Sequence, residues 1–282
     1  MTHKVIKETK RSHNDTAQDT IMLRALHIAA TGMEAQSTKI DNISNNLANV
    51  NTTGYKRSRA DFEDLLYQNL RAAGAANGDG AQAPVGLQVG YGVRTVSSSK
   101  QFSQGDFQNT GNPLDIAIEG QGFLQVVQPS GEVAYSRAGN LKIDGEGQLV
   151  TNGGFPVEPA IQIPPDATSI TIGADGRVTV TQGDTAETTE LGQLQLANFI
   201  NPAGLKSVGR NLYQTTPASG EALVGNPGSD SLGTISQGFL EGSNVNVVEE
   251  MIGLIVAQRS YETNSKVIQA ADEMLRSTNN LT

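Results

Sequence analysis

Residues 243–275 read SNVNVVEEMIGLIVAQRSYETNSKVIQAADEML, and a large apolar side chain recurs there at every seventh position. A seven-residue period places these side chains on one narrow stripe of an α-helix. Asn246 stands at the expected N-cap, and Glu249 occupies the capping-box position three residues later. The stretch therefore predicts a long C-terminal helix, whose stripe consists of Val247, Leu254, Tyr261, Ile268 and Leu275.

The N-terminal part of the chain shows the same seven-residue period in Leu26, Met33, Ile40 and Leu47. The run NNLANVNTTG at 45–54 then brings together side chains that favour turns, and its glycine is suited to a left-handed conformation. We therefore expect a second amphipathic helix that begins near residue 22 and ends near residue 49.

Strand-like patterns dominate between the two helices. Leu114, Ile116 and Ile118 alternate with other residues, and the apolar run 123–127 follows closely. Asp-Gly pairs at 144–145 and 175–176 are typical of hairpin turns. The expected fold class is α+β, with paired N- and C-terminal helices, coiled-coil-like, flanking a β-rich middle domain.

The same patterns divide the chain into four parts. Residues 72–84 are rich in glycine, alanine and asparagine and lack apolar periodicity, so a flexible loop or extended arm is expected there. The expected parts are a disordered extension (1–21), a helical assembly domain (22–50 with 244–282), a connecting arm and loop region (51–92) and a β-rich outer domain (93–243).

The polar extension leaves two interpretations open. It is either an upstream start or cloning remnant, with Met22 as the true first residue, or a functional tail. The extension lacks the apolar run of a cleavable secretion signal. We therefore expect any export to proceed without signal cleavage.

Composition argues against several classes of function. The net charge of −9 makes binding to nucleic acid unfavourable, and no apolar run is long enough for direct membrane insertion. The absence of cysteine excludes disulfides and thiolate chemistry. We therefore expect no nucleic-acid partner, no catalytic thiol and no zinc–thiolate site.

Residues for enzyme chemistry are scarce. His3 and His13 lie in the extension and His27 lies in the first helix, which leaves no basis for a Ser-His-Asp triad or an imidazole metal site. Asp144 and Glu146 could form a glycosidase pair, but they flank a hairpin turn. Gly120-Gln121-Gly122 resembles part of a phosphate loop without its helix or Lys-Ser/Thr continuation, so we interpret it as a turn. The expectation is a protein that is not an enzyme and has no cofactor, no catalytic residue and no metal site.

The two helical stripes have two explanations. A narrow apolar stripe gains stability only when a partner covers it, and the two helices can cover each other in a simple helical hairpin. The helix pattern alone favours that hairpin. The strand-rich middle nevertheless has enough apolar residues to fold without the helices, which favours a role for the stripes in self-association.

Three segments resemble the rod and hook family of bacterial flagellar axial proteins. They are NNLANVNTTGYKR at 45–57 after a helix that starts MLRALHIAATGM, DIAIEGQGFLQVV at 115–127 with YSRAGNLKIDGEGQLVTNGGFPV at 135–157, and the C-terminal stretch 243–275. Within that family, FEDLLYQ at 62–68 and GLQVG at 86–90 are most similar to subunits of the distal rod. Residues 1–21 depart from the family pattern.

This resemblance implies a structural subunit of the distal rod of the flagellar basal body. Such a subunit polymerises into a hollow helical drive shaft that transmits torque from motor to hook and conducts exported subunits. The alternatives are a hook or proximal-rod subunit, or an adaptor between rod and hook.

The resemblance also implies roles for individual residues. The two heptad stripes would form the inner coiled-coil contacts, and Asn46, Asn49, Gly54 and Tyr55 would set the turn that leaves them. A contact arm between subunits would include Asp61, Phe62, Leu65, Leu66, Tyr67, Leu87 and Val89.

The implied partners are further copies of the chain, proximal rod subunits and the hook protein or other hook-side axial subunits. The surrounding periplasmic and outer-membrane rings and the type III export apparatus complete the set. The implied location is the rod that spans the periplasm.

Overall fold

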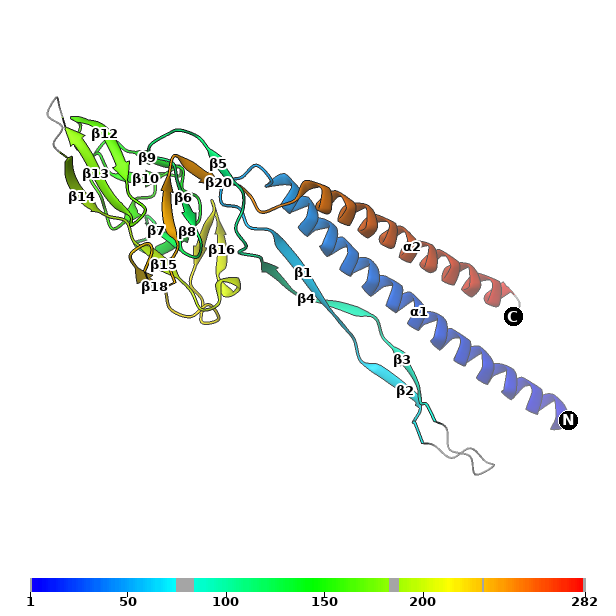
Figure 1. The fold of residues 1–282 in the computed structure, drawn as a ribbon. Helices are drawn as coiled ribbons and strands as arrows, with labels where there is room; N and C mark the ends of the chain where they lie inside the picture. Colours follow the sequence, from blue (N-terminus) through cyan, green and yellow to red (C-terminus); the bar gives the residue numbers. More distant parts are fainter. Residues whose placement is uncertain (1, 75–83, 183–187, 230, 281–282) are drawn as a thin grey trace. The chain divides into compact units, whose positions relative to one another are not determined.

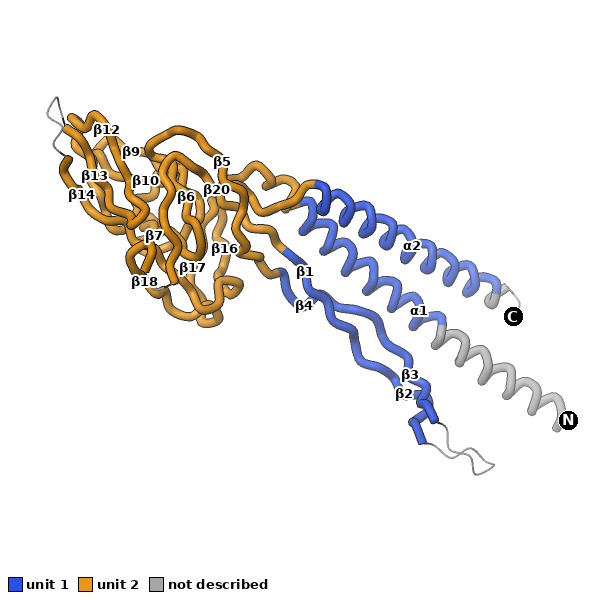
Figure 2. Tube along the Cα trace, in the orientation of Figure 1, with its two compact units in different colours: residues 1–44, 59–98, 248–282 blue, residues 45–58, 99–247 orange. Residues whose placement is uncertain are grey.

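The computed structural model describes residues 2–74, 84–182, 188–229 and 231–280, and within these ranges the side chains of residues 22–277 (Figure 1). The chain divides into two compact units (Figure 2). The helical unit comprises residues 1–44, 59–98 and 248–282, and the β unit comprises residues 45–58 and 99–247. These units differ from the expected domains chiefly because most of the expected arm groups with the helices.

Two long helices, α1 (Thr2–Ala48) and α2 (Val247–Asn280), lie side by side in the helical unit (Figure 1). They run antiparallel, since Gly32 lies against Asn264 whereas Ile43, later in α1, lies against Gly253, earlier in α2. A Cβ atom at Gly32 would lie 2.8 Å from Asn264 Nδ2. Neither helix combines the length and apolar character needed to cross a membrane, as far as the described residues extend.

The end of α1 and the start of α2 agree with the sequence analysis, but α1 begins at Thr2, well before the expected residue 22. The first helix ends at Ala48, next to the expected residue 49, and α2 begins directly after Asn246 with Glu249 and Glu250 in its first turn. The structure places the backbone of residues 2–21 in α1, whereas the sequence analysis expected a disordered extension there.

A β ribbon completes the helical unit. Strand β1 (Ser58–Asp64) pairs with β4 (Val93–Lys100), and β2 (Tyr67–Arg71) pairs antiparallel with β3 (Leu87–Gly90). The ribbon contacts α1, because Gly92 lies against Thr31 and Ser98 Oγ donates a hydrogen bond to Asn42 Oδ1 at 3.0 Å. The loop expected at residues 72–84 falls largely outside the described residues.

Antiparallel strands make up the β unit, as the alternation of apolar residues predicted. Its largest sheet has seven strands in the order β16-β17-β8-β7-β15-β18, with β11 also paired to β7. These strands are β7 (Phe123–Val127), β8 (Val133–Ser136), β11 (Val157–Glu158), β15 (Leu196–Asn198), β16 (Lys206–Gly209), β17 (Leu212–Gln214) and β18 (Leu223–Gly225).

Smaller sheets surround it. Strands β12, β13 and β14 form a three-stranded sheet, and the pairs β5–β20, β6–β19 and β9–β10 are two-stranded. The bounds are β5 (Phe107–Asn109), β6 (Ile116–Glu119), β9 (Leu141–Ile143), β10 (Leu149–Thr151), β12 (Ala167–Ile172), β13 (Arg177–Gln182), β14 (Thr188–Gln193), β19 (Thr234–Gln237) and β20 (Phe239–Glu241), with a 3₁₀ turn at Pro202–Gly204.

The β unit contains two apolar clusters of its own. The larger cluster is aliphatic and centres on fully buried residues such as Ile116, Leu124 and Leu196. The smaller cluster is aromatic, with Phe123 packed edge-to-face against Phe199 at 5.7 Å between ring centroids. The predicted Asp-Gly turns at 144–145 and 175–176 connect β9 to β10 and β12 to β13.

Candidate assembly site

The chain turns back on itself where α1 ends, and Asn46 closes this turn. Its Nδ2 donates to Ser58 O at 2.9 Å, and Ser58 N donates to Asn46 Oδ1 at 2.9 Å. Tyr55 supports the turn by donating its hydroxyl to Asn45 Oδ1 at 2.7 Å. Asn46 is 1% exposed, so both of its polar groups exchange water for backbone partners. The turn is therefore held by hydrogen bonds from side chains to the backbone and between side chains.

Gly54 and Asn49 occupy the same turn in different ways. Gly54 has φ of +67°, as expected, and a Cβ atom there would lie 2.7 Å from Ala138 N. Its N–H donates to Glu241 O at 2.8 Å, so Gly54 packs the turn against the β unit rather than ending α1. Asn49 bonds locally, donating from Nδ2 to Asn45 O at 2.9 Å. The structure thus places the four predicted turn residues in one turn, and their role in assembly stays a prediction.

A buried ionic cluster in the β unit joins distant parts of the sequence. Lys56 Nζ lies 2.7 Å from Glu241 Oε1, and Arg137 Nε lies 2.6 Å from Glu241 Oε2. The three side chains are 1–5% exposed. Because each removes charge from water, their mutual attraction and hydrogen bonds must offset a large desolvation cost. The cluster ties the segment after α1 to the strand before α2.

Backbone groups complete the hydrogen bonding of the cluster. Lys56 Nζ donates to Ser103 O at 2.7 Å, and Gly105 N donates to Glu241 Oε1 at 2.9 Å. The guanidinium of Arg137 donates to Gly122 O at 2.5 Å and to Gly120 O at 2.6 Å. The Gly-Gln-Gly segment is therefore a turn, as predicted, and its carbonyls enclose the arginine.

Burial and the neighbouring charges shift the pKa values of Lys56 and Glu241 in opposite directions. Burial lowers the pKa of Lys56, although Glu241 counteracts that effect. Burial by itself would raise the pKa of Glu241, but Arg137, the N–H of Gly105 and Lys56 together hold this pKa below its ordinary value of 4.5. Glu241 is therefore the ionised anchor of the cluster at neutral pH.

The ionic cluster was not predicted from the sequence. Lys56 and Glu241 lie 185 residues apart, so no spacing rule connects them. A signal was present in the sequence, since Arg137 directly follows β8 and Glu241 ends β20 after two apolar residues, and a charge in such a place needs a partner. Their identification as partners required the fold.

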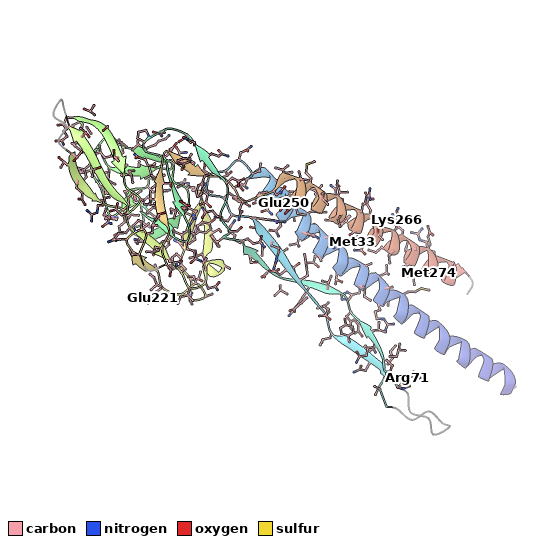
Figure 3. All side chains as sticks on the ribbon, in the orientation of Figure 1. Met33, Arg71, Glu221, Glu250, Lys266 and Met274 are labelled. Atoms are coloured by element: carbon pink, nitrogen blue, oxygen red, sulfur yellow. The ribbon has the colours of Figure 1, made fainter. Side chains whose placement is uncertain are left out.

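The heptad stripes flank the contact between α1 and α2 rather than filling it. Several of the most buried residues of the helix pair are alanines, namely Ala29, Ala257 and Ala271, all 5% exposed or less, and Glu250 is buried as well. Val247 is 38% and Tyr261 is 42% exposed. The other stripe residues, Leu26, Met33, Ile40, Leu47, Leu254, Ile268 and Leu275, are half-buried. Apolar surface therefore remains available beside the helix contact. Met33 of α1, which is labelled in Figure 3, is one of these partly buried residues.

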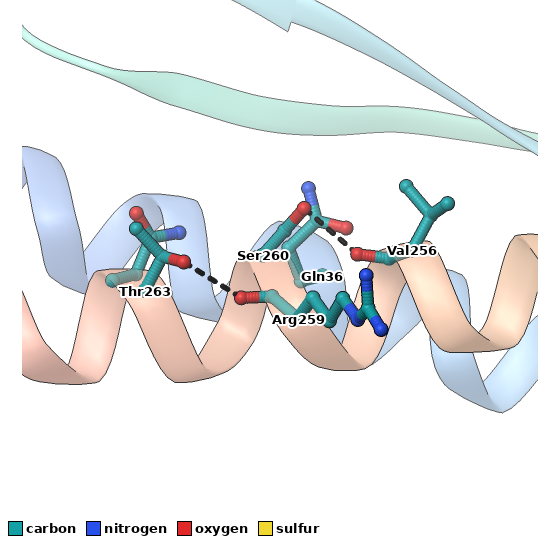
Figure 4. A pocket seen from close by; sticks show the side chains of 6 residues that line it. Gln36, Val256, Arg259, Ser260 and Thr263 are labelled. Atoms are coloured by element: carbon teal, nitrogen blue, oxygen red, sulfur yellow. Dashed lines mark hydrogen bonds between the residues drawn. The ribbon is translucent and has the colours of Figure 1, made fainter.

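A shallow cavity of about 500 Å³ lies along the same helix contact (Figure 4). Gln36 of α1 and Arg259, Ser260 and Asn264 of α2 line it with polar groups. Ser260 Oγ donates to Val256 O at 2.9 Å, which turns its proton back to its own helix. The two helices are thus in contact through small and polar groups along this stretch, which leaves room at the surface.

The predicted arm residues lie on the β ribbon, and several expose apolar surface. Leu66 is 86%, Tyr67 54% and Leu87 54% exposed. Asp61 bonds within the ribbon, accepting from Ser97 Oγ at 3.2 Å. A hydrogen bond to Asp64 raises the pKa of the Tyr67 hydroxyl. Phe62 lies in β1, Val89 lies in β3, and Leu65 lies between β1 and β2. Contact between these residues and another subunit stays a prediction.

Metal-binding geometry is not found in the described part of the chain, where no three His, Asp or Glu side chains gather closely enough to hold an ion. Asp144 acts as a turn former, since its Oδ1 accepts from the N–H groups of Glu146 and Gln148 at 2.8 and 3.1 Å. Asp144 therefore has a structural role in the hairpin between β9 and β10.

Three family models match this sequence, and all describe flagellar proteins. "Flagella basal body rod protein" matches residues 26–56, "Flagellar hook protein FlgE/F/G D1 domain" matches residues 117–180, and "Flagellar basal body rod FlgEFG protein C-terminal" matches residues 236–281. These segments contain Lys56, Arg137 and Glu241, so the three matches meet at the buried cluster.

Curated relatives extend the similarity over most of the chain. Flagellar basal-body rod protein FlgG of Agrobacterium fabrum is 52% identical over 253 residues, which cover 89% of this chain and 97% of the relative. The protein of the same name from Bacillus subtilis is 40% identical, covering 92% and 99%. Flagellar hook-basal body complex protein FlhP of Bacillus subtilis is 35% identical, covering 90% and 97%.

Proposed function

This chain belongs to the family of flagellar basal-body rod proteins, and we propose that it is a structural subunit of the distal part of the flagellar rod. Copies of the chain polymerise through their terminal helices into a hollow helical shaft. The shaft transmits torque from motor to hook and conducts exported subunits through its channel.

The observation that carries this proposal is the apolar surface left open on the helices. The heptad stripes are only partly buried in the single chain, although they are the most regular apolar pattern in the sequence. Burial of apolar surface stabilises association by about 25 cal/mol per Å² removed from water. Neighbouring α1 and α2 helices that close over these stripes would form coiled-coil-like contacts and an inner wall.

The remaining surfaces have matching roles. The β ribbon, with Leu66, Tyr67 and Leu87 exposed, serves as the arm that braces adjacent subunits. The β unit, which has its own apolar core, faces away from the channel. The proposed neighbours are proximal rod subunits, hook-side axial subunits and the rings around the rod, and export proceeds through the type III apparatus without signal cleavage.

A drive shaft needs stiffness rather than catalysis. Torque passes through close-packed cores and repeated contacts between subunits, and such packing resists deformation. Head-to-tail contacts that do not close into a ring generate an open helical filament. The proposed function is therefore that of a non-enzymatic polymer.

Electron microscopy of the purified chain at high concentration tests this function, with and without fragments of isolated rods as seeds. Regular hollow rods, grown alone or from the seeds, are the expected result. Monomers or closed rings in both conditions would contradict the proposal and favour an adaptor between rod and hook.

A further inference from the structure

Each terminal helix carries an outer stripe, defined as the exposed residues opposite the contact between α1 and α2. The outer stripe of α1 consists of His27, Ala30, Glu34, Ser37, Asp41, Ser44 and Ala48. The outer stripe of α2 consists of Val248, Ile252, Ile255, Arg259, Glu262, Lys266, Ala270 and Glu273. Their spacing of three and four residues places each set on one side of its helix.

The outer stripe of α1 lies away from both of its neighbours in the helical unit. Gly32 and Ile43 mark the side of α1 that contacts α2, and Thr31 and Asn42 mark the side that contacts the β ribbon. At 100° per residue, Glu34 and Asp41 fall roughly opposite the α2 contact. Lys266 lies on the outer side of α2 in the same way (Figure 3).

The charges of the two outer stripes are opposite and have the same spacing. Glu34 and Asp41 lie seven residues apart on α1, and Arg259 and Lys266 lie seven residues apart on α2. Seven residues of helix span about 10.5 Å, so both pairs can meet at once. None of these four side chains forms an ion pair with a described residue of its own chain.

We propose that the outer stripe of α1 binds the outer stripe of α2 from a second copy of this chain, with Asp41 opposite Arg259 and Glu34 opposite Lys266. This inference rests on the proposed function and names the contact and register through which copies join. Copies that point the same way along a polymer keep α1 and α2 antiparallel, so a later residue of α1 meets an earlier residue of α2.

The same register fits the remaining residues of both stripes. It places His27 opposite Glu273, and Ala30 opposite Ala270. It also places Ile252 and Ile255 near Ala48 and Ser44, where small side chains allow large ones to approach. Glu262, the acidic residue between Arg259 and Lys266, meets Ser37 rather than a carboxylate. No like charges face each other in this register.

Desolvation explains why the charged pairs would matter. Ile252, Ile255 and Arg259 share one side of α2, so a helix that covers the isoleucines also removes the arginine from water. A buried cation without a carboxylate opposes association, whereas a paired one fixes register.

Charge exchange tests the pairing. We expect Asp41→Arg to abolish rod formation by the full-length chain, and Asp41→Arg combined with Arg259→Asp to restore it to at least half of the wild-type yield. A double variant that assembles no better than Asp41→Arg, although it remains folded by circular dichroism, would overturn the assigned pair.

Disulfide formation tests the register directly, because the natural chain has no cysteine. Cα atoms must approach within about 7 Å for a disulfide, and a shift of one heptad moves them by about 10.5 Å. After mild oxidation of assembled rods, Asp41→Cys with Arg259→Cys should give a ladder of covalent multimers on a non-reducing gel. Glu34→Cys with Lys266→Cys should give the same ladder, and the out-of-register control, Glu34→Cys with Arg259→Cys, should not.

The outcomes distinguish failure of the proposed helix register from failure of the proposed polymer. Rods without a ladder, or a ladder of equal strength in the control, overturn the register and leave the proposed polymer intact. Failure of the wild-type chain to form rods, even from seeds, overturns the polymer and the register together.

Discussion

At the scale of single residues, Glu241 is the anion that joins two buried cations of the β unit. Its two oxygens neutralise Lys56 and Arg137, which come from segments far apart in the sequence. Removing one member of a buried ionic group leaves the others uncompensated in a medium that solvates charge poorly. The stability of the turn after α1 therefore depends on a carboxylate that lies next to α2 in the sequence.

Glu241→Gln should lower the free energy of unfolding of the β unit by about 3–5 kcal/mol, because the amide leaves two buried cations without an anion. Urea unfolding of the isolated full-length chain, followed by tyrosine fluorescence, measures this loss. Glu221→Gln is the matched control, since Glu221 is exposed on the β unit (Figure 3). Equal stability of both variants would show that the cluster contributes little.

The same carboxylate should make stability depend on pH. Because folding lowers the pKa of Glu241, its contribution is fully present above the ordinary value of 4.5 and is lost as the pH falls through the lower folded value. We expect the free energy of unfolding to decrease below pH 4.5, and Glu241→Gln to reduce that decrease. An acid dependence identical in the wild type and the variant would assign it to other carboxylates.

Gly54→Ala should destabilise the β unit in two ways. A left-handed residue other than glycine costs about 1–3 kcal/mol, and at Gly54 the added Cβ would also collide with the backbone at Ala138. Gly111→Ala separates the two effects, because Gly111 has φ of +66° with nothing within 4 Å of the added atom. Thermal unfolding should show that Gly54→Ala lowers the free energy of unfolding roughly twice as much as Gly111→Ala does, because overpacking adds about 1–3 kcal/mol to the cost. Equal losses would mean that the turn can move away from Ala138.

At the scale of elements, the helices and the β unit fold around different kinds of contact. The strands bury large aliphatic and aromatic side chains, whereas the contact between α1 and α2 is made largely by alanine, glycine and short polar residues. Contacts between small side chains stabilise a helix pair weakly, because they remove less apolar surface area from water than contacts between large side chains do. The helix pair is therefore the element that gains most from a neighbouring copy.

Ile268→Asp should prevent rod assembly while leaving the unfolding of the β unit unchanged. Ile268 belongs to the half-buried heptad stripe, and a carboxylate there opposes burial of the stripe against another helix. Gln269→Asp introduces the same charge one position along, on an exposed site outside the stripe, and should still assemble. Rod yield by sedimentation and the melting temperature of the β unit check both halves of the prediction.

The sequence predicted these elements better than it predicted their contacts. Both helices, the antiparallel strands and the Asp-Gly turns have local signals in periodicity and turn chemistry, and the structure confirms them. The ribbon from β1 to β4 was missed, because its exposed strands alternate weakly and the expected loop divides them. Lys56 and Glu241 were missed because their pairing depends on tertiary structure alone.

At the scale of the whole molecule, the similarity to rod proteins and the open surface on the helices agree with each other. The three family matches lie in the N-terminal, middle and C-terminal parts of the chain, and they include both helices and the buried cluster. A subunit of a shaft must keep its fold under torque while presenting surfaces to several neighbours. Close packing inside the β unit keeps its fold under torque. Incomplete packing along the helices leaves surface for the neighbouring subunits.

The measurement that tests this account most directly is a helical reconstruction by electron microscopy of rods assembled from the chain. We expect α1 and α2 of neighbouring copies to line the central channel with their heptad stripes buried, and the β unit to lie outside. A reconstruction with the β unit at the channel, or with Leu254 and Ile268 still exposed to solvent in the rod, would contradict it.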